Sequence, residues 1–212
     1  MTCPLCLSSA ISLYHKDQFR SYQLCGECSL VFVPRDQLVS LEAEKERYDA
    51  HENNENDPGY EKYLKNVVNS LLPHLSPSSH GLDFGCGRSK LLEKLLTKEG
   101  HCVSSYDVFF HRDENLFSKR YDFIIMSEVI EHLRNPHEEM RRVKGLLKQA
   151  ANLFIKTKLL PDSTEKFSNW FYKRDSTHIQ FFGPRSLNKL KERYGFDEYQ
   201  EVGEDLFLFR NN

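Results

Sequence analysis

Short apolar runs alternate with amphipathic stretches through the second half of the chain. Residues 81–84, 102–106, 121–127 and 151–156 are largely apolar and bounded by turn residues, which predicts four strands. Residues 90–98 and 136–148 carry apolar side chains at helical spacing, which predicts helices between them. This alternation predicts a parallel sheet covered by helices on both faces, with ligands bound at the carboxyl ends of its strands.

The pattern changes near the C-terminus. Residues 184–194 predict one more helix, opened by Pro184, and residues 196–202 and 206–210 predict a hairpin. We therefore expect an α/β fold with a Rossmann-like, mostly parallel sheet that ends in an antiparallel hairpin. The hairpin sets this arrangement apart from a standard dinucleotide-binding fold.

Polar residues dominate the segment upstream. Residues 41–62 contain eight acids and three bases, which predicts a helix followed by a loop. Asp57 as N-cap and Pro58 as the first helical residue predict a second helix, and residues 76–80 are typical of a linker. These changes divide the chain into a module of residues 1–40, a helical linker or lid of residues 41–77 and a larger domain of residues 78–212.

Four of the six cysteines form two Cys-x-x-Cys pairs. Cys3 and Cys6 are separated by eighteen residues from Cys25 and Cys28. Each pair can turn two thiolates towards one ion, at the ~2.3 Å sulfur–metal distance of a tetrahedral zinc site. With β-like stretches at residues 11–14, 21–24 and 30–33, the layout predicts a zinc ribbon whose metal supplies much of the folding free energy. Redox pairs or chance spacing are the alternatives.

Composition narrows the class of protein. The 212 residues suffice for one domain with a core and a small additional module, and the net charge of −2 gives no overall attraction to polyanions. The mean hydropathy is −0.60, and neither a membrane-spanning run nor a signal-peptide pattern is present. Cys86 and Cys102 lie outside the pairs, which fits a reducing compartment. We expect a soluble cytoplasmic protein with no membrane partner.

The turn after the first predicted strand carries the clearest ligand signal. Gly85 and Gly87 lie where this strand runs into a helix, and small residues there let a ligand approach the backbone. Asp107 ends the second predicted strand, where a carboxylate can accept from both hydroxyls of a ribose. A nicotinamide cofactor would require a third glycine where the chain has Lys90, so an oxidoreductase is the weaker interpretation.

From about Leu75 onwards, the chain resembles the class I S-adenosylmethionine-dependent methyltransferases. The resemblance rests on residues 82–87 (LDFGCG), 106–107 (YD), 121–125 (YDFII), 127–133 (SEVIEHL) and 175–182 (DSTHIQFF), and on a zinc module that leads into such a domain. It implies an S-adenosylmethionine site formed by Asp83, Gly85, Cys86, Gly87, Asp107, Ser127 and Glu128. Within it, the two glycines would contact the methionine half, and Ser127 and Glu128 would line the pocket at the methyl group. We infer in addition that Arg88 belongs to this site, where it would pair with the carboxylate of the cofactor.

Two features depart from this family. Ser89 and Lys90 stand where many members carry another small residue. The segment between Asp107 and Tyr121 is short, so the family's usual third strand must be shortened or missing. Phe109 and Phe110 in that segment would either sandwich the adenine or belong to the core.

Glu128, Glu131 and His132 follow the third predicted strand at offsets that share one face of a helical turn. His178 is a candidate fourth member. We expect His132, Glu131 and His178 to perform the proton chemistry that a hydroxyl or amide nucleophile requires. By resemblance to small-RNA 3′-terminal 2′-O-methyltransferases and ubiquinone-pathway O-methyltransferases, the four side chains could instead hold a second divalent metal ion, and structural capping of the loop is the third alternative.

Two classes of methyl acceptor fit the sequence. Residues 134–195 carry fourteen bases against six acids, with aromatic residues between them, as an RNA-binding surface does. Solvated helix faces and an aromatic roof over the pocket explain the same pattern, so we favour a small-molecule acceptor. Tyr48, His51 and Asn53 are expected to fold over the active site. The sequence thus predicts a methyltransferase with a zinc ribbon, and a degenerate, non-catalytic binding protein is the main alternative.

Overall fold

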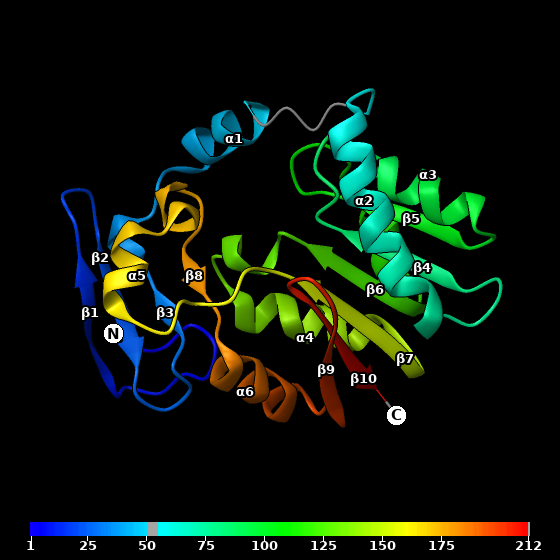
Figure 1. The fold of residues 1–212 in the computed structure, drawn as a ribbon. Helices are drawn as coiled ribbons and strands as arrows, with labels where there is room; N and C mark the ends of the chain where they lie inside the picture. Colours follow the sequence, from blue (N-terminus) through cyan, green and yellow to red (C-terminus); the bar gives the residue numbers. More distant parts are fainter. Residues whose placement is uncertain (51–54, 212) are drawn as a thin grey trace.

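A six-stranded sheet forms the centre of the larger part of the molecule (Figure 1). The structure is a computed structural model that describes residues 1–50 and 55–211. The strands lie in the order β5-β4-β6-β7-β10-β9. Their bounds are β4 His80–Phe84, β5 Cys102–Tyr106, β6 Tyr121–Ser127, β7 Leu147–Lys156, β9 Glu198–Gly203 and β10 Leu206–Asn211. β4, β5, β6 and β7 are parallel, while β10 is antiparallel to both β7 and β9.

Helices cover both faces of this sheet. α2 (Pro58–Leu71) and α3 (Leu91–Lys98) pack on one face, and α4 (Pro136–Leu146) and α6 (Pro184–Tyr194) on the other. The reason lies in the alternation along β6, where Phe123 and Ile125 join the core beneath α2 and α3, and Ile124 and Met126 join the core beneath α4 and α6. The expected fold class is confirmed.

The sequence predicts most of these elements, with different bounds for α4 and β7. Asp57 caps α2 by accepting from the Gly59 amide at 2.8 Å, as expected. β5 is an edge strand, and between it and β6 lies a loop with one short helix, so the missing third strand is confirmed. The predicted bounds of α4 and β7 were wrong, because the chain already pairs with β6 at Leu147 and then passes an irregularity at Ala150, which has a φ of 57°.

A second, four-stranded antiparallel sheet is built mostly from the N-terminal residues. Its order is β1-β2-β3-β8, with bounds β1 Ile11–Lys16, β2 Ser21–Cys25, β3 Val31–Phe32 and β8 Gln180–Phe181. Figure 1 shows β8, coloured orange, beside the blue strands of the N-terminal module. The last strand of this small sheet thus comes from the far end of the chain.

The remaining elements of the described residues are two further α-helices and five short 3-10 helices. α1 (Leu41–Asp49) is capped by Ser40, and α5 (Thr164–Asn169), which the sequence analysis missed, is capped by Ser163. The short 3-10 helices are η1 Arg35–Gln37, η2 Leu72–His74, η3 Glu114–Ser118, η4 Ile130–His132 and η5 Phe171–Arg174. None of the described helices is both long and apolar enough to cross a bilayer.

Candidate active site

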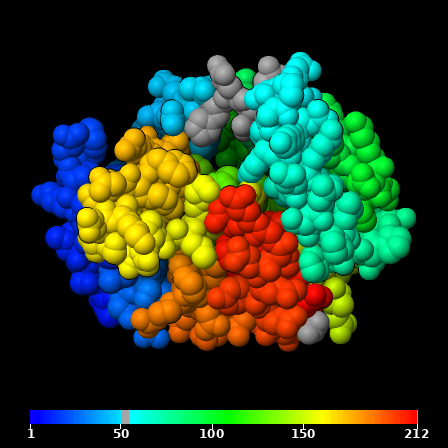
Figure 2. All heavy atoms as spheres, viewed as in Figure 1, coloured from blue at the N-terminus to red at the C-terminus, as the bar shows by residue number. Residues whose placement is uncertain are grey.

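A cavity of about 1270 Å³ opens at the carboxyl ends of β4, β5 and β6. Its walls come from the turns that follow these strands, from α1 and α2, and from residues 171–178. Figure 2 shows the surface hollowed between α1, α2 and the β9–β10 turn. The site therefore lies where a parallel α/β sheet is expected to bind its ligand.

The glycine turn after β4 has a left-handed backbone conformation. Gly85 and Gly87 have φ angles of 84° and 64°, in the left-handed region that favours glycine. The Gly85 amide donates to the Tyr106 carbonyl at 2.8 Å, which ties the turn to β5. A Cβ on Gly85 would lie 2.6 Å from Cγ2 of Val129, so close packing as well as φ requires glycine here.

Asp107 holds this turn and its own loop together. Its Oδ2 accepts from the Gly87 amide at 3.0 Å, and its Oδ1 accepts from the amides of Phe109 and Phe110 at 2.8 and 3.1 Å. The side chain is 9% exposed and lines the cavity. The carboxylate thus fixes the position of the two strand ends that a nucleotide ligand would touch.

The other predicted cofactor residues also line the cavity, which includes Asp83, Cys86, Arg88, Ser127 and Glu128. Burial, helped by the charges of Glu93 and Asp107, raises the pKa of Asp83 to about 8. Arg88 forms an ion pair with Asp49 of α1 and lies over the Phe110 ring at 4.8 Å from its centroid.

Phe109 and Phe110 are half-buried cavity residues rather than members of the described core. Phe109 packs against Tyr48 of α1, with ring centroids 5.7 Å apart. Tyr48 also meets the His132 ring edge-on at 5.3 Å, so α1 reaches the predicted catalytic residues. His51 and Asn53, which were expected to join it, lie outside the described residues.

The turn after β6 brings two carboxyl groups onto one hydroxyl. Glu128 has a φ of 54°, and its Oε2 lies 2.9 Å from the Tyr172 hydroxyl. The same hydroxyl lies 2.5 Å from Oε1 of Glu131, which is fully buried. Burial, with the charge of Glu128 added, raises the pKa of Glu131. The tyrosine hydroxyl can donate its proton to only one of the two carboxyl groups. The other carboxyl group is therefore protonated and donates to the tyrosine oxygen.

Two histidines complete what we call the acid–histidine cluster, defined as Glu128, Glu131, His132, Tyr172 and His178. His132 Nδ1 lies 3.0 Å from the Thr177 carbonyl, and His178 Nδ1 lies 2.7 Å from the Tyr172 carbonyl. Because a carbonyl only accepts, each Nδ1 carries the proton, and the lone pair of a neutral ring is on Nε2. The structure thus brings together all four predicted residues, and adds Tyr172.

The same cluster meets part of the requirement for a metal site. One ligand atom each from Glu131, His132 and His178 lies within 4.8 Å of the others. Backbone carbonyls that orient both imidazoles are also typical around metal ligands. Glu131 is, however, already engaged with Tyr172, and a carboxyl pair that shares a proton is a weaker cation ligand than two free carboxylates.

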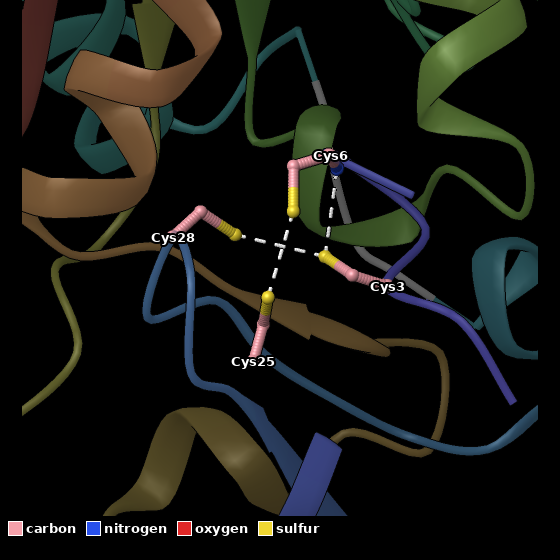
Figure 3. A group of neighbouring side chains, drawn as sticks. All are labelled: Cys3, Cys6, Cys25 and Cys28. Atoms are coloured by element: carbon pink, nitrogen blue, oxygen red, sulfur yellow. Dashed lines mark hydrogen bonds between the residues drawn. The ribbon is translucent and has the colours of Figure 1, made fainter. Parts of the chain in front are cut away.

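The four N-terminal cysteines form a compact tetrahedral group. Cys3 Sγ lies 3.6 Å from Cys28 Sγ, and Cys6 Sγ lies 3.5 Å from Cys25 Sγ. These two lines cross in Figure 3, as opposite edges of a tetrahedron do. Edges of about 3.8 Å correspond to the ~2.3 Å sulfur–zinc distance, whereas a disulfide requires ~2.05 Å. All four thiols are free, so the group fits a zinc ion and contains no disulfide.

Sequence comparison identifies the family. Residues 55–201 match the methyltransferase domain family. The chain belongs to this family. No curated protein matches the chain in sequence.

Solved structures show the same fold in other methyltransferases. The Burkholderia thailandensis 1,6-didemethyltoxoflavin-N1-methyltransferase, with 1,6-didemethyltoxoflavin and S-adenosylhomocysteine bound, is 14% identical with a TM-score of 0.59, over 95% of this chain and 99% of that chain. The Synechocystis magnesium protoporphyrin IX methyltransferase, with S-adenosylhomocysteine bound, is 13% identical with a TM-score of 0.55, over 81% and 94%. The predicted resemblance to S-adenosylmethionine-dependent methyltransferases is confirmed, which leaves the oxidoreductase interpretation without support.

Proposed function

We propose that this methyltransferase domain transfers the methyl group of S-adenosylmethionine to an oxygen or nitrogen nucleophile of a small-molecule acceptor. The observation that carries the proposal is that one cavity is lined both by the glycine turn, which Asp107 holds, and by four members of the acid–histidine cluster. These four are Glu128, His132, Tyr172 and His178, while Glu131 is fully buried and does not line the cavity. The glycine turn supplies a nucleotide-binding edge, and the cluster supplies proton acceptors beside it.

The residues around the cavity fit this cofactor. The left-handed Gly85 and Gly87 leave the backbone of the turn open to a ligand, and Asp107 is placed to accept from ribose hydroxyls. Asp83 and Glu128 add carboxyl oxygens to the wall, which can accept hydrogen bonds from the ammonium group of the ligand. When bound, S-adenosylmethionine supplies an electrophilic methyl group on its sulfonium.

The residues of the cluster then determine how the acceptor loses its proton. His132 is held through Nδ1 by the Thr177 carbonyl, so Nε2 is the nitrogen that takes the proton. His178, held in the same tautomer, packs edge-on against it with ring centroids 4.6 Å apart. The carboxyl pair bridged by Tyr172 places negative charge near the imidazolium that forms.

A second divalent ion bound by Glu131, His132 and His178 would perform the same task by lowering the pKa of the acceptor hydroxyl. We favour proton transfer to the histidine over activation by a metal ion, because the Tyr172 hydroxyl already bridges the two carboxyl groups. Titration of Mg²⁺ and Mn²⁺ into the protein with S-adenosylhomocysteine present discriminates between them.

Charge pairing and burial favour a small-molecule acceptor over RNA. Several of the bases in residues 134–195 pair with acids, as in Arg134–Glu44 and Lys158–Asp205. Most aromatic residues of that region are buried in the core, namely Phe167, Tyr172, Phe181 and Phe182. Fewer groups are therefore left to contact phosphates and stack on bases than the sequence suggests. The two similar methyltransferases also act on small molecules, as their names state.

Calorimetric titration with S-adenosylhomocysteine tests the cofactor site. We expect micromolar binding by the wild type and a loss of roughly 10–100-fold in D107A, because a charged acceptor is removed. D113A is the matched control, since Asp113 caps its own turn in the same loop, at the Asn115 amide, without lining the cavity. Absence of binding at millimolar ligand, or equal affinities in the two variants, would overturn the assignment. The degenerate, non-catalytic alternative would then gain support.

A further inference from the structure

The segment of residues 171–181 has two sides with different partners. On its inner side, Tyr172 bridges Glu128 and Glu131, and the carbonyls of Tyr172 and Thr177 hold the two histidines. The tautomers of His132 and His178 therefore depend on where this backbone lies. A group that fixes the segment from outside would fix the proton acceptors as well.

The outer side is held by one arginine of the cysteine-rich module. Arg20 Nη2 donates to the carbonyls of Lys173 and Asp175 at 2.7 and 2.9 Å, and Nη1 donates to that of Ser176 at 3.0 Å. A guanidinium carries five N–H donors in one rigid plane, so a single side chain fixes three peptide groups in a defined geometry. An ammonium group has no such fixed fork.

Arg20 is itself held in place. Its Nε donates to the Tyr22 hydroxyl at 3.0 Å, and that hydroxyl donates to Oδ2 of Asp17 at 3.1 Å. The same Oδ2 accepts from Nζ of Lys173 at 2.7 Å, where Lys173 is only 8% exposed. These contacts join the module and the segment in a closed network. Its carboxylate, that of Asp17, is linked directly to Lys173 and through Tyr22 to Arg20.

The backbone continues this connection into the cluster. β3 of the module pairs with β8 at the end of the segment, and the Val33 amide donates to the Ile179 carbonyl at 2.9 Å. The Ile179 amide in turn donates to the Glu131 carbonyl at 2.9 Å. The module is thus joined to a cluster residue by two successive backbone hydrogen bonds.

We propose that Arg20 is a positioning residue of the active site, through which the cysteine-rich module holds residues 173–176 and thereby sets the orientation and tautomer of His132 and His178. The inference rests on the proposed function, because it takes the cluster to be the proton acceptor. It extends that function by making the module part of the catalytic apparatus. Small displacements of reacting groups matter because transfer requires aligned atoms.

The test uses three measurements that need no acceptor. Nitrogen-15 spectra of the histidine rings report the tautomers, with H132Q and H178Q used to assign the signals. Hydrogen exchange of the amides of residues 172–179 reports how firmly the segment is held, and calorimetry with S-adenosylhomocysteine reports the cofactor site. R185A is the matched control, because Arg185 also joins the two parts of the molecule, at the Glu27 carbonyl, but does not touch the segment.

In the wild type we expect two neutral rings protonated on Nδ1. In R20A we expect a mixture of tautomers and exchange in the segment that is faster by ~10-fold or more, since local opening becomes easier. The S-adenosylhomocysteine affinity should stay within a factor of about 3, because the hydrogen bonds of the Arg20 side chain go to no residue of the glycine turn or the Asp107 loop. R20K should lie between wild type and R20A.

Unchanged tautomers and exchange in R20A, or changes no larger than those in R185A, would overturn the inference. If R20A fails to fold, R20K provides the test. Histidine spectra and amide exchange in R20K that equal those of the wild type would then overturn the inference. Failure of the proposed function looks different, because the wild type itself would then not bind S-adenosylhomocysteine.

Discussion

Gly85 offers a sharp test of how the glycine turn is packed. In G85A the new methyl group meets two costs. The left-handed φ of 84° costs an alanine about 1 kcal/mol. The Cβ would also lie 2.6 and 2.9 Å from the two Cγ atoms of Val129, and overpacking of this kind costs about 1–3 kcal/mol. We therefore expect a loss of about 2–4 kcal/mol in the free energy of unfolding, or roughly 5–15 °C in Tm.

Three further variants, G100A, V129A and G85A/V129A, separate these costs. G100A is the control for the backbone, because Gly100 has a φ of 88° and no atom within 4 Å of an added Cβ. It should lose only about 1 kcal/mol. In G85A/V129A the clashing methyl groups are gone, so the double variant should be at least about 1 kcal/mol more stable than the sum of the single effects predicts. Urea denaturation compares the wild type with all four variants, and either a G85A loss equal to that of G100A or strict additivity with V129A would refute the reasoning.

Other predictions concern a buried acid and the cysteine group. The folded protein holds the Asp83 proton up to about pH 8, whereas the unfolded chain releases it near its ordinary value of 3.8, so stability falls as pH rises between these values. Relative to D83N, the wild type should lose up to about 1.4 kcal/mol per pH unit between pH 5 and 7, as measured by urea denaturation, and parallel curves would contradict this. C25S should reduce bound zinc from about one equivalent by elemental analysis and unfold the N-terminal module, since tetrahedral sites of this kind contribute folding energy directly. Full zinc occupancy in that variant would contradict the tetrahedral assignment, and S12A in exposed β1 is its control.

The order of strands and helices could be predicted because it depends on local patterns. The runs that become β4 and β6 are largely buried on both faces, and the chain between Asp107 and Tyr121 is too short for another strand-helix unit. The glycine turn and Asp107 were found for the same reason, since each lies directly after a strand that the pattern predicts. The sequence gives no comparable signal for β8, which is only two residues long.

Contacts between distant segments account for what the sequence analysis missed. Tyr172 looked like one of several aromatic residues over the pocket, and only the fold shows that its hydroxyl joins Glu128 to Glu131. The sequence analysis did not single out Arg20, whose partners lie more than 150 positions later. No periodicity or spacing rule links residues so far apart, because the link depends on how β3 and β8 come to pair.

The pairing of β3 with β8 also constrains the order in which the chain folds. During synthesis β1, β2 and β3 emerge early, but their sheet keeps an open edge at β3 until Gln180 and Phe181 have been made. The four cysteines can bind a metal before then. β8, by contrast, joins the sheet through a contact between residues far apart in the sequence, which is a slow step in folding. A nascent chain that stops short of Gln180 would therefore expose a sheet edge beside a finished metal centre, a species open to pairing with other chains.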